Sequence, residues 1–167
     1  MENFICKIPN LDEMNTKWDY EIDHADEDKN NWIVWKKENL DRFNKGLIIP
    51  YYGILDGQII CECTAIIDPS IVQNPKDIID EKTAYLSAFR TIDEYKGKGY
   101  FSKIFNYMIE DLKSRGYERV TLGVEPEEKH NKEIYFHYGI TDYIKTEKES
   151  YPDGTVIDVE YYGKSIK

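Results

Sequence analysis

The segment that decides the fold is residues 91–102, which read TIDEYKGKGYFS. It lies between an expected strand over residues 83–91 and the most regular helix that the sequence predicts. Its two glycines let the backbone approach a ligand closely, and the first N–H groups of a helix have no partner within it. Together with the helix dipole, these groups indicate a site for a pyrophosphate. The helix is predicted from apolar side chains at spacings of three and four, namely Phe101, Ile104, Phe105, Met108 and Leu112.

Two lysines, Lys96 and Lys98, add positive charge to this segment of an otherwise acidic chain. The spacing excludes a P-loop, because no Gly-Lys-Ser/Thr ending follows. The incomplete glycine pattern also disfavours a dinucleotide-binding fold. An ordinary glycine-rich turn with solvated lysines is the alternative to an anion site.

The pattern on both sides of this segment predicts a mixed α/β sheet with flanking helices. Asp56-Gly57 is a strong hairpin turn, because both positions tolerate a positive φ. Helices are expected over residues 11–20, 28–43 and 127–138, and strands over residues 46–55, 58–67, 83–91, 118–125, 140–146 and 155–162. Since no repeat or linker interrupts the chain, residues 1–167 are expected to form a single domain.

Charge and hydropathy limit the partners and the location. There are 22 Lys and Arg against 32 Asp and Glu, a net charge of −10. Such a surface repels nucleic acid and attracts a cationic small molecule, or serves only solubility. No apolar run approaches the roughly 20 residues that span a bilayer. The first residues do not resemble a signal peptide, so we expect a cytoplasmic protein that does not bind membranes.

The counts of cysteine, histidine and tyrosine bear on metal binding and on oligomerisation. The chain has three cysteines and three histidines, too few at workable spacing for a zinc site, so no metal is expected. The 14 tyrosines are compatible with a homodimer interface.

The sequence resembles the GNAT superfamily of acyl-CoA-dependent N-acyltransferases from about residue 51 to the C-terminus. The loop motif of that family, Gln/Arg-x-x-Gly-x-Gly/Ala, falls on residues 96–101, KGKGYF, where Gly99 matches the required glycine. Lys96 replaces Gln/Arg, and Phe101 stands where the family prefers a small residue. A second family pattern, Leu-Tyr-x-x-x-Gly-Phe, falls on residues 134–140, IYFHYGI.

The resemblance implies that acetyl-CoA binds at the first of these motifs. The strand before the loop would offer backbone groups to the pantetheine arm, and the loop would hold the pyrophosphate. The strand positions are Phe89, Arg90 and Thr91, and the loop positions are Lys96, Gly97, Lys98, Gly99, Tyr100, Phe101 and Ser102.

The resemblance also implies that Tyr135 is the general acid that reprotonates the CoA thiolate. Among the carboxylates, Glu125 at the end of a predicted strand could accept a proton from an ammonium, or form a surface ion pair. Glu62 could reach the acceptor side of the sheet, or be a solvated strand residue. The two histidines near Tyr135, His130 and His137, are not expected to be catalytic.

These observations predict an N-acetyltransferase that moves an acetyl group from acetyl-CoA to a primary amine by direct attack in a ternary complex. The acceptor would be a small molecule or a peptide, and a cationic one suits the aromatic and acidic residues near both ends of the chain. Two alternatives stay open: a non-catalytic CoA-sensing module, and an acidic interaction domain without a cofactor.

Overall fold

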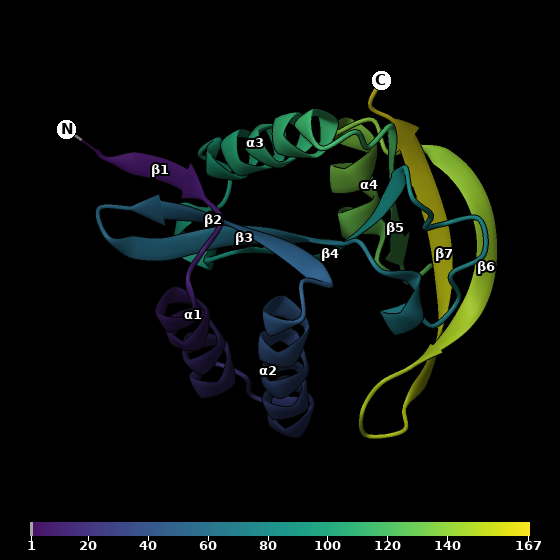
Figure 1. Ribbon diagram of the computed structural model, residues 1–167. Coiled ribbons are helices and arrows are strands. Elements are labelled where there is room, and N and C mark those ends of the chain that lie inside the picture. Colours follow the sequence, from purple (N-terminus) through teal and green to yellow (C-terminus); the bar gives the residue numbers. More distant parts are fainter. Residues whose placement is uncertain (1) are drawn as a thin grey trace. The chain divides into compact units, whose positions relative to one another are not determined.

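Residues 2–167 are described by a computed structural model (Figure 1). Within them, seven strands form one mixed sheet in the order β1-β2-β3-β4-β5-β7-β6. The chain divides into two compact units. The first comprises Met1–Thr64 and Ala88–Met108, and the second comprises Ala65–Ser87 and Ile109–Lys167. The predicted fold class, a mixed sheet with flanking helices, is confirmed.

The first unit holds the N-terminal helices and the start of the sheet. Helices α1 and α2 lie on one side of strands β2 and β3, and α3 begins on the other side (Figure 1). Asn10 caps α1, because its side chain accepts from the Glu13 N–H and the Glu13 carboxylate accepts from the Asn10 N–H. The elements that begin in this unit are β1 (Phe4–Lys7), α1 (Leu11–Asp23), α2 (Lys29–Asn44), β2 (Ile48–Leu55), β3 (Gln58–Ile66), the 3₁₀ turn η2 (Asp93–Tyr95) and α3 (Tyr100–Ser114).

Strand β1 was not expected from the sequence. It pairs antiparallel with β2, from Phe4 opposite Leu55 to Lys7 opposite Tyr52. The hairpin between β2 and β3 is as predicted, since Asp56 and Gly57 have φ values of 48° and 87°. Both values are positive, as a type I′ turn requires.

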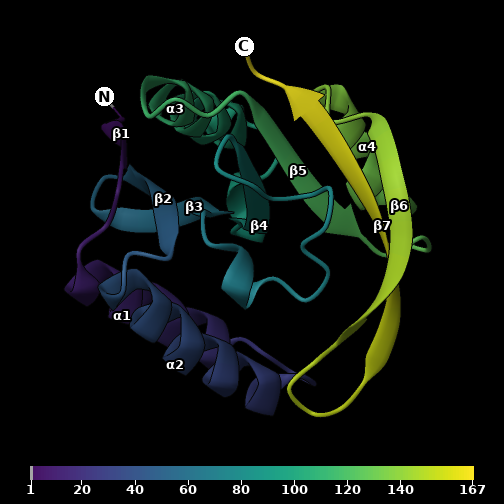
Figure 2. The same ribbon diagram turned by 45° about the vertical axis from the view of Figure 1, so that its right-hand side comes forward.

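The second unit contains a long antiparallel pair, β6 (Asp142–Ser150) and β7 (Val156–Ser165) (Figure 2). Strand β7 also pairs antiparallel with β5 (Arg119–Val124), while β4 (Thr83–Thr91) and β5 run parallel. Helix α4 (Lys129–His137) packs on β7, where the Phe136 and Tyr162 rings are 5.1 Å apart. A 3₁₀ turn, η1 (Pro69–Ile71), occupies part of the loop before β4.

Helix α3 follows the predicted apolar stripe. Ile104, Phe105, Met108 and Leu112 are all at most 2% exposed. The helix ends with the backbone N–H groups of Gly116 and Tyr117 bonded to the carbonyls of Lys113 and Leu112. Gly116 has φ 94°, the left-handed conformation that helix ends favour.

The strand expected over residues 140–146 is displaced along the chain, to Asp142–Ser150. Ile140 is fully buried but precedes β6, which starts at Asp142. Its N–H donates to the Tyr135 carbonyl, so it belongs to the turn that follows α4 rather than to a strand.

Candidate functional site

The loop before α3 owes its course to two glycines. Gly97 and Gly99 have φ values of 74° and 85°, and a Cβ at either would meet no atom within 4 Å. Glycine is therefore needed there for backbone conformation, not for space. The preceding turn is closed by the Tyr95 and Lys96 N–H groups, which donate to the carbonyls of Ile92 and Asp93.

Most bulky side chains of this loop point into the protein. Tyr100 is buried, and its hydroxyl donates to Glu2 Oε2 at 2.6 Å. The Phe101 ring lies 5.6 Å from the Phe89 ring and 6.3 Å from the Phe105 ring. Phe101 thus packs against β4 and the next turn of α3. The GNAT superfamily, which the sequence resembles, prefers a small residue at this position. The backbone of residues 97–102 at the helix start can therefore face an anion.

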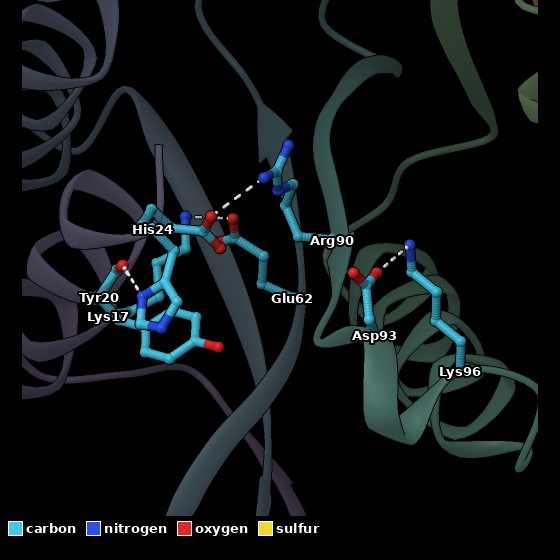
Figure 3. Close-up of polar contacts among 8 residues, drawn as sticks. Lys17, Tyr20, His24, Glu62, Arg90, Asp93 and Lys96 are labelled. Atoms are coloured by element: carbon cyan, nitrogen blue, oxygen red, sulfur yellow. Dashed lines mark hydrogen bonds and ion pairs between the residues drawn. The ribbon is translucent and has the colours of Figure 1, made fainter. Parts of the chain in front are cut away.

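The two loop lysines are both accessible. Lys96 Nζ lies 2.8 Å from Asp93 Oδ1 (Figure 3), and its side chain is 61% exposed. Lys98 Nζ lies 5.7 Å from the centre of the Tyr95 ring. Each can therefore turn towards a phosphate without leaving a buried partner.

Strand β4 contains a left-handed residue shortly before this loop. Its parallel ladder with β5 runs from Thr83 opposite Arg119 to Leu86 opposite Leu122. Ala88 then has φ 56°, a left-handed value that is uncommon for a residue with a side chain. Such a residue bends a strand and re-aims the positions after it. These positions include Phe89–Thr91, the stretch expected to meet the pantetheine arm.

In the second unit, the turn after β5 brings two carboxyl groups together. The Glu128 N–H donates to the Glu125 carbonyl at 3.0 Å. A hydrogen bond with the Glu128 carboxyl, together with burial, raises the pKa of Glu125 from 4.5 to about 7. Asn131 donates its side-chain amide to Glu128 on the other side. Glu125 and Glu128 thus form a carboxyl pair.

Tyr135 lies two turns along the same segment and is half-buried. Burial, and next the charge of Glu128, raise the pKa of its hydroxyl to about 12. The phenol therefore keeps its proton through neutral and mildly alkaline pH. Glu128 thus influences both catalytic candidates.

A cavity of about 310 Å³ opens in the first unit. Among its lining side chains are Lys17 and Glu21 of α1, Glu62 of β3 and Arg90 of β4. Of the two alternatives for Glu62, a solvated strand residue is wrong, because Glu62 is buried and ion-paired with Lys17. Lys17 and Glu21 were not predicted as site residues from the sequence. The one signal is Glu62 itself, because a single charged residue in the apolar run IICECTAI indicates a buried partner of opposite charge.

Membrane spans and metal clusters are both absent from the described part of the chain. No helix in it is long and apolar enough to cross a membrane. No three His, Cys, Asp or Glu side chains in it are grouped so as to hold a metal ion.

The sequence model of the acetyltransferase (GNAT) family matches residues 9–139, most of the chain. The protein belongs to the GNAT family. A comparison with curated protein sequences gives no match.

Solved structures of similar fold include other GNAT-type acetyltransferases. The ribosomal-protein-S18-alanine N-acetyltransferase of Escherichia coli has a TM-score of 0.70 at 14% identity, covering 99% of this chain and 95% of that one. The acetyl transferase of Salmonella typhimurium that modifies the N-terminal serine of ribosomal protein L7/L12 has a TM-score of 0.70 at 12% identity, covering 98% and 95%. The Salmonella typhimurium protein yncA, solved with its cofactor acetyl-CoA, has a TM-score of 0.65 at 13% identity, covering 99% and 95%. At these identities the likeness shows a shared GNAT fold.

Proposed function

We propose that this GNAT protein transfers an acetyl group from acetyl-CoA to a primary amine. The observation that carries the proposal is the loop of residues 96–102. It is exposed up to Gly99, turned by two left-handed glycines and followed at once by the start of a 15-residue helix. The unpaired N–H groups of a helix start and its dipole bind anions such as a pyrophosphate. Membership of an acetyltransferase family supports the identity of that anion.

The residues of the first unit would hold acetyl-CoA, which supplies an acetyl group activated as a thioester. The backbone of Phe89, Arg90 and Thr91 would hydrogen-bond the pantetheine arm and polarise the thioester carbonyl. The backbone of Gly97 to Ser102 would bind the pyrophosphate, with Lys96, Lys98 and the Ser102 hydroxyl in support. Tyr100 and Phe101, whose side chains pack inward, would contribute only their backbone N–H groups.

Two residues of the second unit would move protons. Glu125, as a carboxylate, would accept a proton from the acceptor ammonium, since an ammonium has no lone pair with which to attack. The amine nitrogen then bonds to the acetyl carbon as the carbon–sulfur bond breaks, and the nitrogen releases its second proton to solvent. Tyr135 would give its proton to the departing sulfur and regain one from solvent. These roles rest on the family resemblance and on the surroundings of each side chain.

Binding should be tested first, by a thermal-shift titration with acetyl-CoA beside CoA, ATP and NADH. A ligand that binds only the folded protein stabilises it by about 2.7 kcal/mol at a hundredfold excess over its Kd. We expect a saturable shift with acetyl-CoA and CoA that ATP and NADH do not reproduce. Absence of any shift would remove the cofactor assignment and favour an interaction domain.

Catalysis should be tested next by thiol release with a panel of amines. Tyr135→Phe should lower kcat by about 10² to 10⁴, the usual contribution of a general acid. It should leave the acetyl-CoA shift in place. Tyr117→Phe, three residues after the end of α3, is the matched control and should keep full activity. Tight acetyl-CoA binding without thiol release from any amine would instead indicate a sensing module.

A further inference from the structure

The cavity of the first unit is built around four charged side chains. They form two ion pairs: Lys17 with Glu62 (Figure 3), and Arg90 with Glu21. Lys17 and Glu21 are one turn apart on α1, while Glu62 and Arg90 come from β3 and β4. The Ile92 N–H donates to the Ile60 carbonyl at 2.9 Å, which ties the end of β4 to β3 at this place. The charges therefore sit on a rigid frame of one helix and two strands.

The Lys17–Glu62 pair is almost completely buried. Their side chains are 4% and 3% exposed. Apart from each other, Lys17 Nζ and Glu62 Oε1 have no hydrogen-bond partner among the described residues. A buried ion pair offsets its desolvation only when its remaining donors and acceptors are also satisfied. Both residues line the cavity, and a polar ligand that reaches either group would complete its hydrogen bonding.

Arg90 is the accessible member of the cluster. Its guanidinium lies 3.0 Å from Glu21 Oε2 and 4.4 Å from the centre of the Trp32 ring, and its side chain is 47% exposed. The ring and the carboxylate hold the planar group in one orientation, while the exposed side remains open. A guanidinium presented in this way suits bidentate binding of a carboxylate.

The balance of charge in the cavity decides what kind of amine fits. A cavity for a simple diamine or polyamine would present carboxylates without accompanying cations. The chain is rich in carboxylates, with 32 Asp and Glu and a net charge of −10. Here each carboxylate is accompanied by a cation, so the four charges sum to zero. A ligand that complements this arrangement carries both signs. The volume, about 310 Å³, is at the lower end for ligand sites and suits a small molecule.

We propose that this cavity binds the acetyl acceptor, and that the acceptor is a free amino acid or a close analogue carrying both an ammonium and a carboxylate. The ammonium is held by Glu21 and Glu62, and the carboxylate by Arg90. That the bound amine becomes acetylated rests on the function proposed above. The backbone of Arg90 belongs to the strand proposed to hold the pantetheine arm, so its side chain lies at the boundary of donor and acceptor.

The test compares matched acceptors that differ only in the carboxylate. Each of the twenty amino acids and ornithine is assayed by thiol release beside its amide and its decarboxylated amine, for example lysine, lysinamide and cadaverine. We expect kcat/KM for the best amino acid to exceed that for its amide and amine by about tenfold or more, the effect of one hydrogen-bonded charged group. Amides or peptide N-termini that react as well as free amino acids would overturn the proposal and favour a peptide acceptor. Amines that react as well would favour a polyamine.

A variant pair assigns the preference to Arg90. Within Arg90→Leu, the ratio of kcat/KM for amino acid over amine should fall towards one, whereas Arg42→Leu should keep the wild-type ratio. Arg42 is a suitable control because it also pairs with a glutamate, Glu38, on a helix of the same unit. A ratio unchanged in Arg90→Leu would contradict the assignment.

A binding measurement separates this proposal from the proposed function. Calorimetric titration with the same amino acids, without acetyl-CoA, should show binding that Arg90→Leu weakens. Amino-acid binding with no acetyl-CoA shift would reject the transferase function and keep the cavity assignment. Acetyl transfer to amines, with neither binding nor acetylation of amino acids, would reject the cavity assignment and keep the transferase function.

Discussion

The carboxyl pair of Glu125 and Glu128 makes a prediction about pH. If Glu125 is the base, kcat/KM should fall as pH drops through about 7, because the proton then occupies the carboxylate. Glu128→Gln removes the neighbouring acid and should move this limb about 1 to 2 pH units lower. The pH profile of thiol release measures the shift. Glu133→Gln, elsewhere on α4, should leave the limb in place, and a limb that stays near 7 in Glu128→Gln would exclude Glu125.

The same pair makes the stability depend on pH. The pKa of Glu125 is raised in the folded protein, so its contribution to stability is fully present below about 4.5 and is lost as pH rises through 7. Chemical denaturation between pH 4 and 8 should therefore show a shallower decline with pH for Glu128→Gln than for the wild type. Equal slopes would mean that the two carboxyl groups do not share a proton.

The buried Lys17–Glu62 pair predicts a strongly non-additive stability effect. Lys17→Met leaves a buried carboxylate without its partner and should cost about 3 to 5 kcal/mol. The double variant Lys17→Met/Glu62→Leu should recover most of that loss. Urea denaturation measures both. Lys36→Met, which breaks the exposed pair with Asp19, should cost at most about 1 kcal/mol, and a similar loss for Lys17→Met would show that its pair is not buried.

At the scale of elements, the loop between β4 and α3 has a conformational requirement that is independent of its ligand. Gly97→Ala and Gly99→Ala should each cost about 1 to 2 kcal/mol, because both glycines are left-handed. They should also weaken acetyl-CoA binding about tenfold or more, equivalent to about 1.4 kcal/mol, by moving the N–H groups at the helix start. Denaturation and thermal-shift titration measure the two effects. Gly116→Ala is the control: its glycine is also left-handed and unobstructed, so it should lose stability but keep acetyl-CoA binding.

Element prediction from the sequence succeeded where the signal is local. The stripe from Phe101 to Leu112 and the Asp56-Gly57 turn depend on periodicity and on positive φ, and both are confirmed. Strand β1 was missed because Phe4–Lys7 is only four residues long and becomes a strand by pairing with β2, about fifty residues away. The insertion of β7 between β5 and β6 is likewise a long-range pairing that no local pattern predicts.

At the scale of the whole molecule, the two compact units are interleaved in the chain. Strands β3 and β4 and helix α3 each contain residues of both units. We therefore expect one cooperative unfolding transition, as for a single domain. All three tryptophans, Trp18, Trp32 and Trp35, belong to the first unit, so their fluorescence reports that unit, while far-UV circular dichroism reports both. The two probes should give the same urea midpoint, and separated midpoints would indicate two domains.

From the sequence alone, the class of fold, the strand–loop–helix order around residues 91–102 and the GNAT resemblance could be predicted. Those features follow from side-chain periodicity, from glycine conformation and from motif spacing, all of which act over a few residues. The burial of Glu62 against Lys17 and the placement of Arg90 beside Glu21 and Trp32 are visible only in the tertiary structure. The ionisation and ligand preference of these groups depend on desolvation and on neighbouring charges. Folding supplies both by bringing distant segments together, so a linear pattern cannot specify them.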